Sequence, residues 1–207
     1  MPTDLSAAPI STIIFDLSEV LITGLLDIEK PLAHRLGIPS DGLFPAFGGQ
    51  PLTELFCGRI TEDAYLDALI EKQRWNISKD ELKVLIRQNF HRRIPGMEQV
   101  VANLSARFEL VLLSDHAREW IADIKTHHPF LEMCTHQFYS YELGQTKAAP
   151  STFTRVLDTI QRCPGQCLFI DDWIDNVAAA QRAEIRAIRF LGAADLMRRL
   201  TEMGLWK

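Results

Sequence analysis

The stretch STIIFDLSEVLI, residues 11–22, places one acidic side chain directly after a short apolar run. The residues of Thr12–Phe15 are β-branched or aromatic, a composition typical of a buried strand. Asp16 follows at the point where this strand ends. In open α/β sheets, ligands bind outside the carboxyl ends of the strands. The sequence therefore predicts a functional carboxylate at position 16.

Four further apolar runs follow after residue 100, and amphipathic segments separate them. Alternation of strand and helix is typical of parallel βαβ units, whose right-handed crossovers place helices on both faces of one sheet. We therefore predict an α/β fold with a doubly wound, Rossmann-like parallel sheet. The further strands are expected in FELVLLSD (108–115), HQFYSYEL (136–143), QCLFIDD (166–172) and RAIRF (186–190).

The segment between the first and second predicted strands shows helical patterns alone. Thr61 is a typical helix start, and Ser78 with Glu81 has the spacing of a capping box. We predict that residues 25–94 form a small α-helical cap subdomain, inserted over the carboxyl ends of the strands. The α/β core domain then comprises residues 1–24 and 95–207.

The composition argues against several classes of function. With 207 residues and 47% hydrophobic content, the chain can bury a sizeable core. A net charge of −5 and a pI near 5.7 provide no basic field for binding nucleic acid or an anionic membrane. Because no apolar run approaches the length of a spanning helix and the first ten residues lack signal-peptide features, we expect a cytoplasmic protein, as a monomer or a homodimer.

The cysteines and a pair of histidines offer weak signals. Four cysteines are too few and too irregularly spaced for a disulfide framework, so we expect free thiols. Cys163 and Cys167 have a spacing that invites a metal site, but no second ligand pair accompanies them. His127 and His128 precede a proline, and we expect a helix-end pair rather than metal ligands.

Several chemically active side chains follow the predicted strands at their carboxyl ends, where they would share one crevice. Each alone has a structural explanation, such as a turn residue, a surface lysine or a helix N-cap. Together they provide a nucleophilic carboxylate, a hydroxyl donor, a cation and carboxylates that can hold Mg²⁺, which is the equipment for phosphoryl transfer. The residues are Asp16, Ser114 with Asp115, Lys147, and Asp171 with Asp172.

Over nearly its whole length the chain resembles the haloacid dehalogenase superfamily. Four segments carry the resemblance in the order and spacing of the family's motifs, and the helical insert lies where members of the first cap class carry theirs. The segments are FDLSEVL (15–21), LLSD (112–115), LGQTK (143–147) and FIDDWIDN (169–176).

The resemblance implies a Mg²⁺-dependent hydrolase in which Asp16 is the nucleophile. It implies that Ser114 donates to the transferring group and that Lys147 is the charge partner of the nucleophile and the phosphoryl group. Ser18 and Asp115 would contact the substrate, which we expect to be a small phosphorylated metabolite. The Mg²⁺ ligands would be Asp16, the backbone carbonyl of Ser18 and Asp172, with Asn176 or Asp175 in support.

Ser18 is the main departure from the family's pattern, because its phosphatases usually place a second aspartate there as general acid and base. Dehalogenases of the superfamily also lack that aspartate, but they need no metal, and Asp172 keeps an acid suited to Mg²⁺. We therefore favour a phosphatase that acts through a phospho-aspartate on Asp16. Two alternatives stay open, a catalytically impaired member that binds a ligand or protein partner, and a 2-haloacid dehalogenase. Asp115 or His116 is a candidate substitute for the missing proton carrier.

The cap supplies specificity in such an architecture. The loop FPAFGGQP, residues 44–51, is the best candidate for contacting the ligand, because loops carry much of the binding function of folds. The structural alternative for Phe56 and Trp75 is that they form the cap's own core. The candidates for substrate contact are Phe44, Phe47, Phe56, Arg59 and Trp75.

Overall fold

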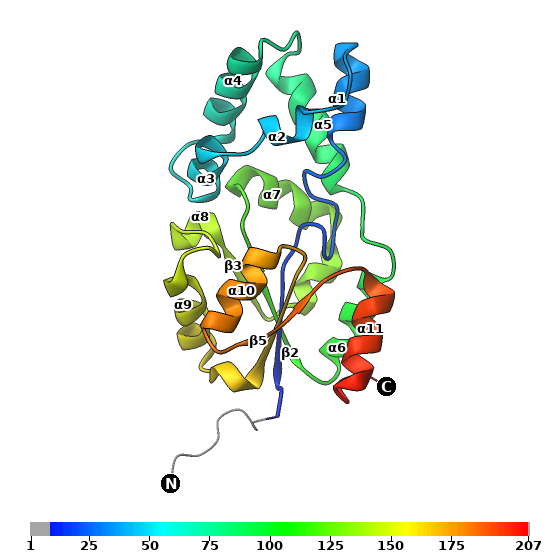
Figure 1. Ribbon diagram of the computed structural model, residues 1–207, viewed down its shortest axis with the longest axis vertical. Helices are drawn as coiled ribbons and strands as arrows, with labels where there is room; N and C mark the ends of the chain where they lie inside the picture. The colour runs from blue at the N-terminus through cyan, green and yellow to red at the C-terminus, as the bar shows by residue number, and fades with distance from the viewer. Residues whose placement is uncertain (1–8, 207) are drawn as a thin grey trace.

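The computed structural model of this protein describes residues 9–206. Its centre is a five-stranded sheet in which every neighbouring pair is parallel, with the order β3-β2-β1-β4-β5 (Figure 1). The first strand lies in the middle and the chain winds outward from it in both directions, which confirms the predicted doubly wound α/β class. The strands are β1 (Thr12–Phe15), β2 (Glu109–Ser114), β3 (His136–Tyr139), β4 (Cys167–Asp171) and β5 (Arg186–Arg189).

Helices cover both faces of the sheet, because successive apolar side chains of a strand point to opposite faces and both need burial. Ile13 and Phe15 of β1 pack in the layer that contains α6, α7 and α11. Ile14 packs in the opposite layer, which contains α9 and α10. The helices of this sheet domain are α6 (Met97–Ser105), α7 (Arg118–His127), α8 (Ser140–Leu143), α9 (Pro150–Ile160), α10 (Ile174–Arg182) and α11 (Ala193–Glu202), with 3₁₀ helices η2 (Pro129–Met133) and η3 (Pro164–Gln166).

Residues 25–94, which we call the helical insert, contribute helices and no strand of the sheet. Figure 1 shows them gathered at one end of the molecule. Thr61 Oγ1 accepts a hydrogen bond from Ala64 N, and Ser78 and Glu81 form a complete capping box, so both predicted helix starts are confirmed. The helices are α1 (Glu29–Leu36), α2 (Leu43–Ala46), α3 (Gln50–Phe56), α4 (Glu62–Gln73) and α5 (Lys79–Phe90).

Trp120 of α7 joins the sheet domain to the helical insert. Its indole Nε1 donates to Glu62 Oε1 of α4 over 2.7 Å. Arg87 of α5 donates to both oxygens of Glu62, over 2.8 and 2.7 Å. The Glu62 side chain is 3% exposed, so these bonds satisfy a carboxylate that would otherwise be costly to bury. The rings of Phe56 and Phe90 pack against Trp120 and complete the junction.

The chain enters and leaves the helical insert at adjacent points. Asn89, buried near the end of α5, donates through its amide to the carbonyl oxygens of Gly24 and Leu26. Ile22 and Arg93 form an isolated antiparallel bridge. The two crossings are therefore tied to each other. Within residues 9–206 no helix combines the length and the apolar character needed to cross a membrane.

One predicted strand is shorter than its apolar run, and one local prediction was wrong. The apolar run at residues 136–143 is not one strand, because β3 ends at Tyr139 and α8 begins at Ser140. Short apolar runs of this kind do not distinguish strand from helix, and Gly144 with φ of 69° ends the short helix. The expected loop at residues 44–51 contains most of α2 and the start of α3, where Pro51 in the first turn suits a helix.

Candidate active site

Lys147 lies between two carboxylates at the carboxyl ends of neighbouring strands. Phe15 of β1 pairs with Ile170 of β4, so the next residues along each strand, Asp16 and Asp171, are brought together by the register. Lys147 Nζ lies 2.6 Å from Asp16 Oδ1 and 2.7 Å from Asp171 Oδ2. The structure thus brings the expected nucleophile and the expected cation into direct contact.

Burial and charge oppose each other in this cluster. Its three side chains are each at most 9% exposed. Burial raises the pKa of Asp16 well above its usual range, and the ammonium group of Lys147 works against that rise. Burial alone would lower the pKa of Lys147, but the charges of Asp16 and Asp171 outweigh it and raise that pKa. Lys147 therefore stays protonated and holds the two carboxylates together.

A third carboxylate, Asp172, completes a donor set for a divalent cation. One oxygen each from Asp16, Asp171 and Asp172 lie within 4.8 Å of one another. When all are ionised, three carboxylates against one ammonium group would leave an excess of two negative charges, which a divalent cation would balance. Burial and the charge of Asp171 raise the pKa of Asp172, an effect that a bound cation would reverse. Carboxylate oxygens suit Mg²⁺, so the residues present fit the expected ion.

Asn176 supports Asp171 through its amide. Its Nδ2 donates to both carboxylate oxygens of Asp171, over 3.2 and 3.1 Å, and Trp173 N donates to Asp171 Oδ1 over 2.8 Å. These donors lie at the start of α10, where the helix dipole favours negative charge. Asn176 also lines the cavity described below, whereas Asp175 is exposed. Of the two residues expected to support the metal site, Asn176 is the one positioned there.

Ser18 faces a buried histidine. Ser18 Oγ and His116 Nε2 are 2.8 Å apart. The rings of Phe56, Phe90 and Trp120 surround His116, and burial lowers its pKa to about 3. His116 is therefore neutral near pH 7 and forms a hydrogen bond with Ser18. Its other ring nitrogen, Nδ1, is buried with no hydrogen-bond partner among residues 9–206.

The end of β2 supplies two residues that differ in access to the site. Asp115 lines the cavity, and both of its carboxylate oxygens accept from the backbone N–H of Lys147, at 3.0 and 3.1 Å. Burial raises the pKa of Asp115 to about 6, against the effect of the Lys147 charge. Ser114 is completely buried and is not among the residues lining the cavity, and its hydroxyl has no hydrogen-bond partner in the described chain. Its expected contact with the transferring group stays a prediction.

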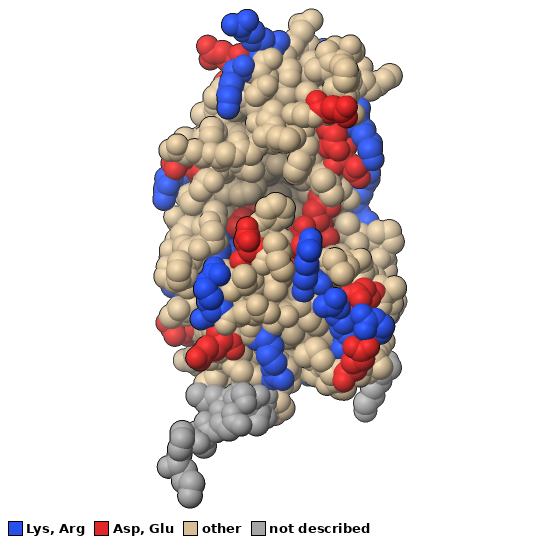
Figure 2. Space-filling model, in the orientation of Figure 1, with Lys and Arg blue, Asp and Glu red and all other residues tan. Residues whose placement is uncertain are grey.

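These groups open into a cavity of about 620 Å³ between the sheet domain and the helical insert. Figure 2 shows a hollow between the two parts, with acidic side chains near it. Among the described residues, Lys147 is the sole lysine or arginine that lines this cavity. A ligand would therefore meet one cationic group and largely apolar walls. The apolar lining includes Leu25, Leu26, Phe44, Leu52, Phe56 and Trp173.

Of the side chains expected to contact substrate from the helical insert, Phe44 and Phe56 line the cavity. Phe47 and Trp75 are buried against each other, with ring centroids 5.7 Å apart, and belong to the insert's own core. Arg59 pairs with a glutamate of α3 and does not line this cavity.

Three features of the site could not be read from the sequence. The acidic doublet after β4 signals a function for Asp171, but not that it binds Lys147. The position of His116 just beyond β2 signals nearness to the crevice, but not its contact with Ser18. Glu19 lines the cavity and adopts φ of 59°, with its carboxylate accepting from a backbone N–H in the entry crossing. No sequence signal points to that role.

Several solved structures with a similar fold are those of hydrolases. The HAD family enzyme bt-2542 from Bacteroides thetaiotaomicron, in complex with magnesium and inorganic phosphate, has a TM-score of 0.73 and 20% identity, covering 89% of this chain and 96% of that one. A predicted HAD-like family hydrolase from Porphyromonas gingivalis has a TM-score of 0.76 and 19% identity, covering 97% and 100%. The L-2-haloacid dehalogenase from Xanthobacter autotrophicus, with chloropropionic acid covalently bound, has a TM-score of 0.68 and 15% identity, covering 96% and 85%. At these identities the likeness shows the fold.

The family is shown by a direct match of the sequence. The comparison with curated proteins found no match. The family model of the haloacid dehalogenase-like hydrolases matches residues 10–184, which include every strand except β5. The chain belongs to the haloacid dehalogenase-like hydrolases.

Proposed function

We propose that this hydrolase is a Mg²⁺-dependent phosphatase of small phosphorylated metabolites. The observation that carries the proposal is the cluster in which Lys147 holds Asp16 and Asp171, with Asp172 beside them. Its excess of two negative charges calls for a divalent cation, and its single ammonium group suits a phosphoryl group. The similar enzyme bt-2542 was solved with both magnesium and inorganic phosphate, which supports the same pairing here.

The side chains divide the chemistry between them. Asp16 attacks phosphorus through a carboxylate oxygen, and the ester P–O bond breaks with its electron pair leaving on the alcohol oxygen. Water then attacks the phosphorus of the phospho-aspartate, which restores the Asp16 carboxylate and releases phosphate. Lys147 offsets the negative charge that gathers on the phosphoryl oxygens. Asp16, Asp172 and the backbone carbonyl of Ser18 would hold the Mg²⁺, which when bound supplies further charge neutralisation.

The environment of Ser18 favours substrates with good leaving groups. A serine hydroxyl is too weakly acidic to protonate a leaving alkoxide, and its partner His116 has a pKa of about 3 and holds no extra proton near pH 7. Asp115, which lines the same cavity with a pKa of about 6, stays the candidate for a substitute proton carrier. Aryl, acyl and sugar 1-phosphates need less protonation than alkyl phosphates. The apolar cavity walls, with Phe44 and Phe56 among them, fit an apolar or aromatic leaving group.

The helical insert is proposed to act as a cap that closes over the site and excludes water before the chemical step. It supplies part of the cavity wall, and the chain enters and leaves it at adjacent points near Gly24 and Arg93. Adjacent crossings permit rotation of the insert as one body about a single hinge.

A second candidate is a 2-haloacid dehalogenase. It is favoured by the apolar cavity and by the presence of a serine at position 18, where phosphatases of the family usually have an aspartate. The similar Xanthobacter enzyme was solved with chloropropionic acid covalently bound. The third carboxylate, Asp172, argues for the phosphatase, because it adds negative charge that a metal-free reaction on a carboxylate substrate would have to overcome.

A substrate panel separates these functions. Phosphate release from aryl, acyl, sugar and alkyl phosphates is measured with Mg²⁺ and with EDTA, beside chloride release from 2-chloropropionate. We expect phosphate release that requires Mg²⁺ and is fastest with the aryl and acyl esters. Chloride release that persists in EDTA would identify a dehalogenase. Binding of phosphate esters without turnover of any compound would identify a catalytically impaired member.

A further inference from the structure

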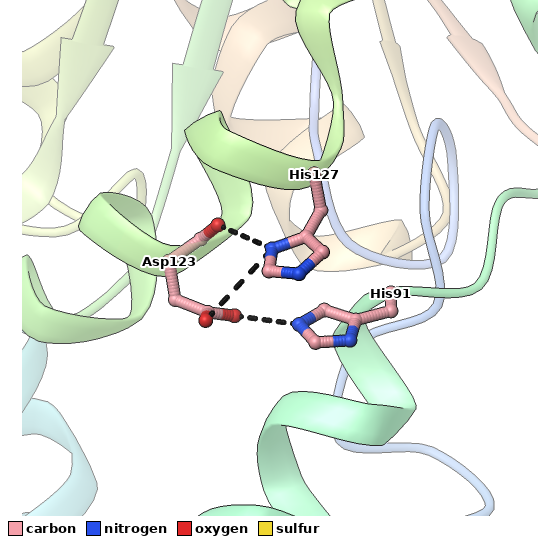
Figure 3. Close-up of side chains that lie close together, drawn as sticks. All are labelled: His91, Asp123 and His127. Atoms are coloured by element: carbon pink, nitrogen blue, oxygen red, sulfur yellow. Dashed lines mark hydrogen bonds and ion pairs between the residues drawn. The ribbon is translucent and has the colours of Figure 1, made fainter.

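We infer that His91, Asp123 and His127 form a second metal site, for Zn²⁺ or a similar transition-metal ion, at the junction of the helical insert with the sheet domain. Within residues 9–206 these side chains bring one donor atom each to within 4.8 Å of the others. His91 directly follows α5 of the insert, whereas Asp123 and His127 lie on α7 of the sheet domain. Figure 3 shows the three side chains turned toward one another from these two helices.

The donor set fits a transition metal and not Mg²⁺. Two imidazoles with one carboxylate are typical zinc ligands, whereas Mg²⁺ prefers oxygen donors alone. Asp123 and His127 are four residues apart, so they share one face of α7, the arrangement by which helical metal motifs present two ligands. The acidic group at the active site, Asp16, Asp171 and Asp172, in contrast offers oxygen donors alone. The histidine-containing site should therefore prefer transition-metal ions, and the carboxylate site should prefer Mg²⁺.

The distances are close to those of a tetrahedral site. Bonds of about 2.0–2.1 Å in a tetrahedron separate neighbouring ligand atoms by about 3.3 Å. His91 Nε2 lies 2.9 Å from Asp123 Oδ2, and His127 Nδ1 lies 3.8 Å from Asp123 Oδ1. These two contacts use different oxygens of Asp123, and one donor atom from each residue lies within 4.8 Å of the others, so a bound ion would draw the three donors together. Some ring rotation is required, because the two imidazoles are stacked at 3.5 Å.

The surroundings support the site. The side chains of His91, Asp123 and His127 are 32%, 24% and 42% exposed, so an ion can enter and water can fill a fourth position. Arg87 Nε lies 3.9 Å from Asp123 Oδ2, but the guanidinium of Arg87 is held by both oxygens of Glu62, which offsets its charge. His127 Nδ1 lies 2.9 Å from the backbone oxygen of Asp123 and 2.8 Å from Thr126 Oγ1, contacts that a bound ion would replace.

His128 holds the two helix ends in place. It is 1% exposed, and its Nε2 donates to the carbonyl oxygen of Phe90, the last residue of α5, over 2.8 Å. The two neighbouring histidines therefore point in different directions. His128 is buried, whereas the ring of His127 stacks on that of His91. His128, the residue after α7, already links that helix to the end of α5, and a bound ion would add a second link between these helices. That end lies beside the crossing about which the insert is proposed to rotate.

Co²⁺ is a suitable probe, because its absorption spectrum reports tetrahedral coordination. Tag-free protein is titrated with Co²⁺ in excess Mg²⁺, which occupies the carboxylate cluster, and bound Co²⁺ is then displaced with Zn²⁺. We expect saturable binding with a tetrahedral spectrum. His91→Gln and His127→Gln should each weaken binding about tenfold or more. The control His34→Gln, at an exposed histidine of α1, and Asp172→Asn, in the carboxylate cluster, should retain it.

A second measurement needs no variant. Diethyl pyrocarbonate modifies accessible imidazoles, and mass spectrometry of the wild-type protein locates the adducts with and without Zn²⁺. His91 and His127 should be protected by Zn²⁺, with His34 unchanged. The inference is overturned if the wild type shows no saturable Co²⁺ binding, if His91→Gln binds as tightly as the wild type, or if Zn²⁺ protects neither histidine. The three side chains would then be a hydrogen-bonded cluster and nothing more.

Discussion

Replacing Lys147 with methionine removes the cation from the carboxylate cluster while keeping a side chain of similar length. Lys147 Nζ contacts Asp16 Oδ1 at 2.6 Å and Asp171 Oδ2 at 2.7 Å, and all three side chains are nearly inaccessible to solvent. Removing one partner from a buried ion pair costs about 3–5 kcal/mol, because the remaining charge is left without compensation. We expect Lys147→Met to lower the free energy of unfolding at pH 8 by about that amount.

The loss should depend on pH in a known direction. Without Lys147, the folded-state pKa of Asp16 rises further above the unfolded value, so the folded variant binds more protons than the unfolded chain. Its stability relative to the wild type should therefore recover as the pH falls, by about 1.4 kcal/mol per pH unit for each carboxyl that takes up a proton. Added Mg²⁺ should also recover part of the loss by binding the folded state alone.

Urea unfolding at several pH values, with and without Mg²⁺, measures these effects. Lys30→Met is the matched control, because Lys30 pairs with Asp27 at 2.7 Å but is 71% exposed, and its loss should not be measurable. A Lys147→Met variant as stable as the wild type at pH 8, or one whose loss is the same at all pH values, would refute the reasoning about the buried cluster.

Three further predictions concern the surroundings of Ser18. Burial holds the folded-state pKa of His116 at about 3, against about 6.5 in the unfolded chain. Its contribution to the free energy of unfolding is therefore present above pH 6.5 and falls by about 1.4 kcal/mol for each pH unit toward pH 3. In urea unfolding, the stability difference between the wild type and His116→Gln should narrow as the pH falls from 6.5 to 3, and a constant difference would contradict the assignment. A Cβ on Gly24 would lie 2.7 Å from Ser18 Cβ, so Gly24→Ala should lower the free energy of unfolding in urea by about 1–3 kcal/mol. The control is Gly48→Ala, whose new Cβ would lie no closer than 3.5 Å to its nearest neighbour. Equal stabilities of the two variants would count against the close packing of Gly24 on Ser18. Ser18→Asp should add a general acid and raise turnover of an alkyl phosphate about tenfold or more, with a smaller gain for p-nitrophenyl phosphate. Equal gains for both substrates would show that the aspartate does not act by protonating the leaving group.

The parallel, doubly wound class of the sheet and the placement of Asp16 could be predicted because both depend on local patterns. Apolar runs followed by acids mark the carboxyl ends of strands, and parallel strands bring those ends to one edge. The capping box at Ser78 is also local, since its two bonds join residues three apart. The division of residues 136–143 into β3 and α8 was not predictable in this way, because a run of eight mixed apolar residues fits either element.

The contacts that distinguish this site depend on distant parts of the chain. Ser18 and His116 are 98 residues apart, and Lys147 reaches Asp171 across 24. Periodicity and spacing carry no information on such pairs, whose geometry follows from strand register and from packing of the helical insert. The same holds for His91 and Asp123, which meet through the crossing of α5 and α7.

The central claim is that Asp16 is the nucleophile of a Mg²⁺-dependent phosphatase. The most direct test compares hydrolysis of p-nitrophenyl phosphate by the wild type and by Asp16→Asn in saturating Mg²⁺, with circular dichroism to establish that both are folded. An amide keeps the shape of the side chain but supplies no attacking anion, so the account predicts Mg²⁺-dependent turnover by the wild type and less than about one per cent of it in the variant. A folded Asp16→Asn protein with turnover comparable to the wild type would contradict it.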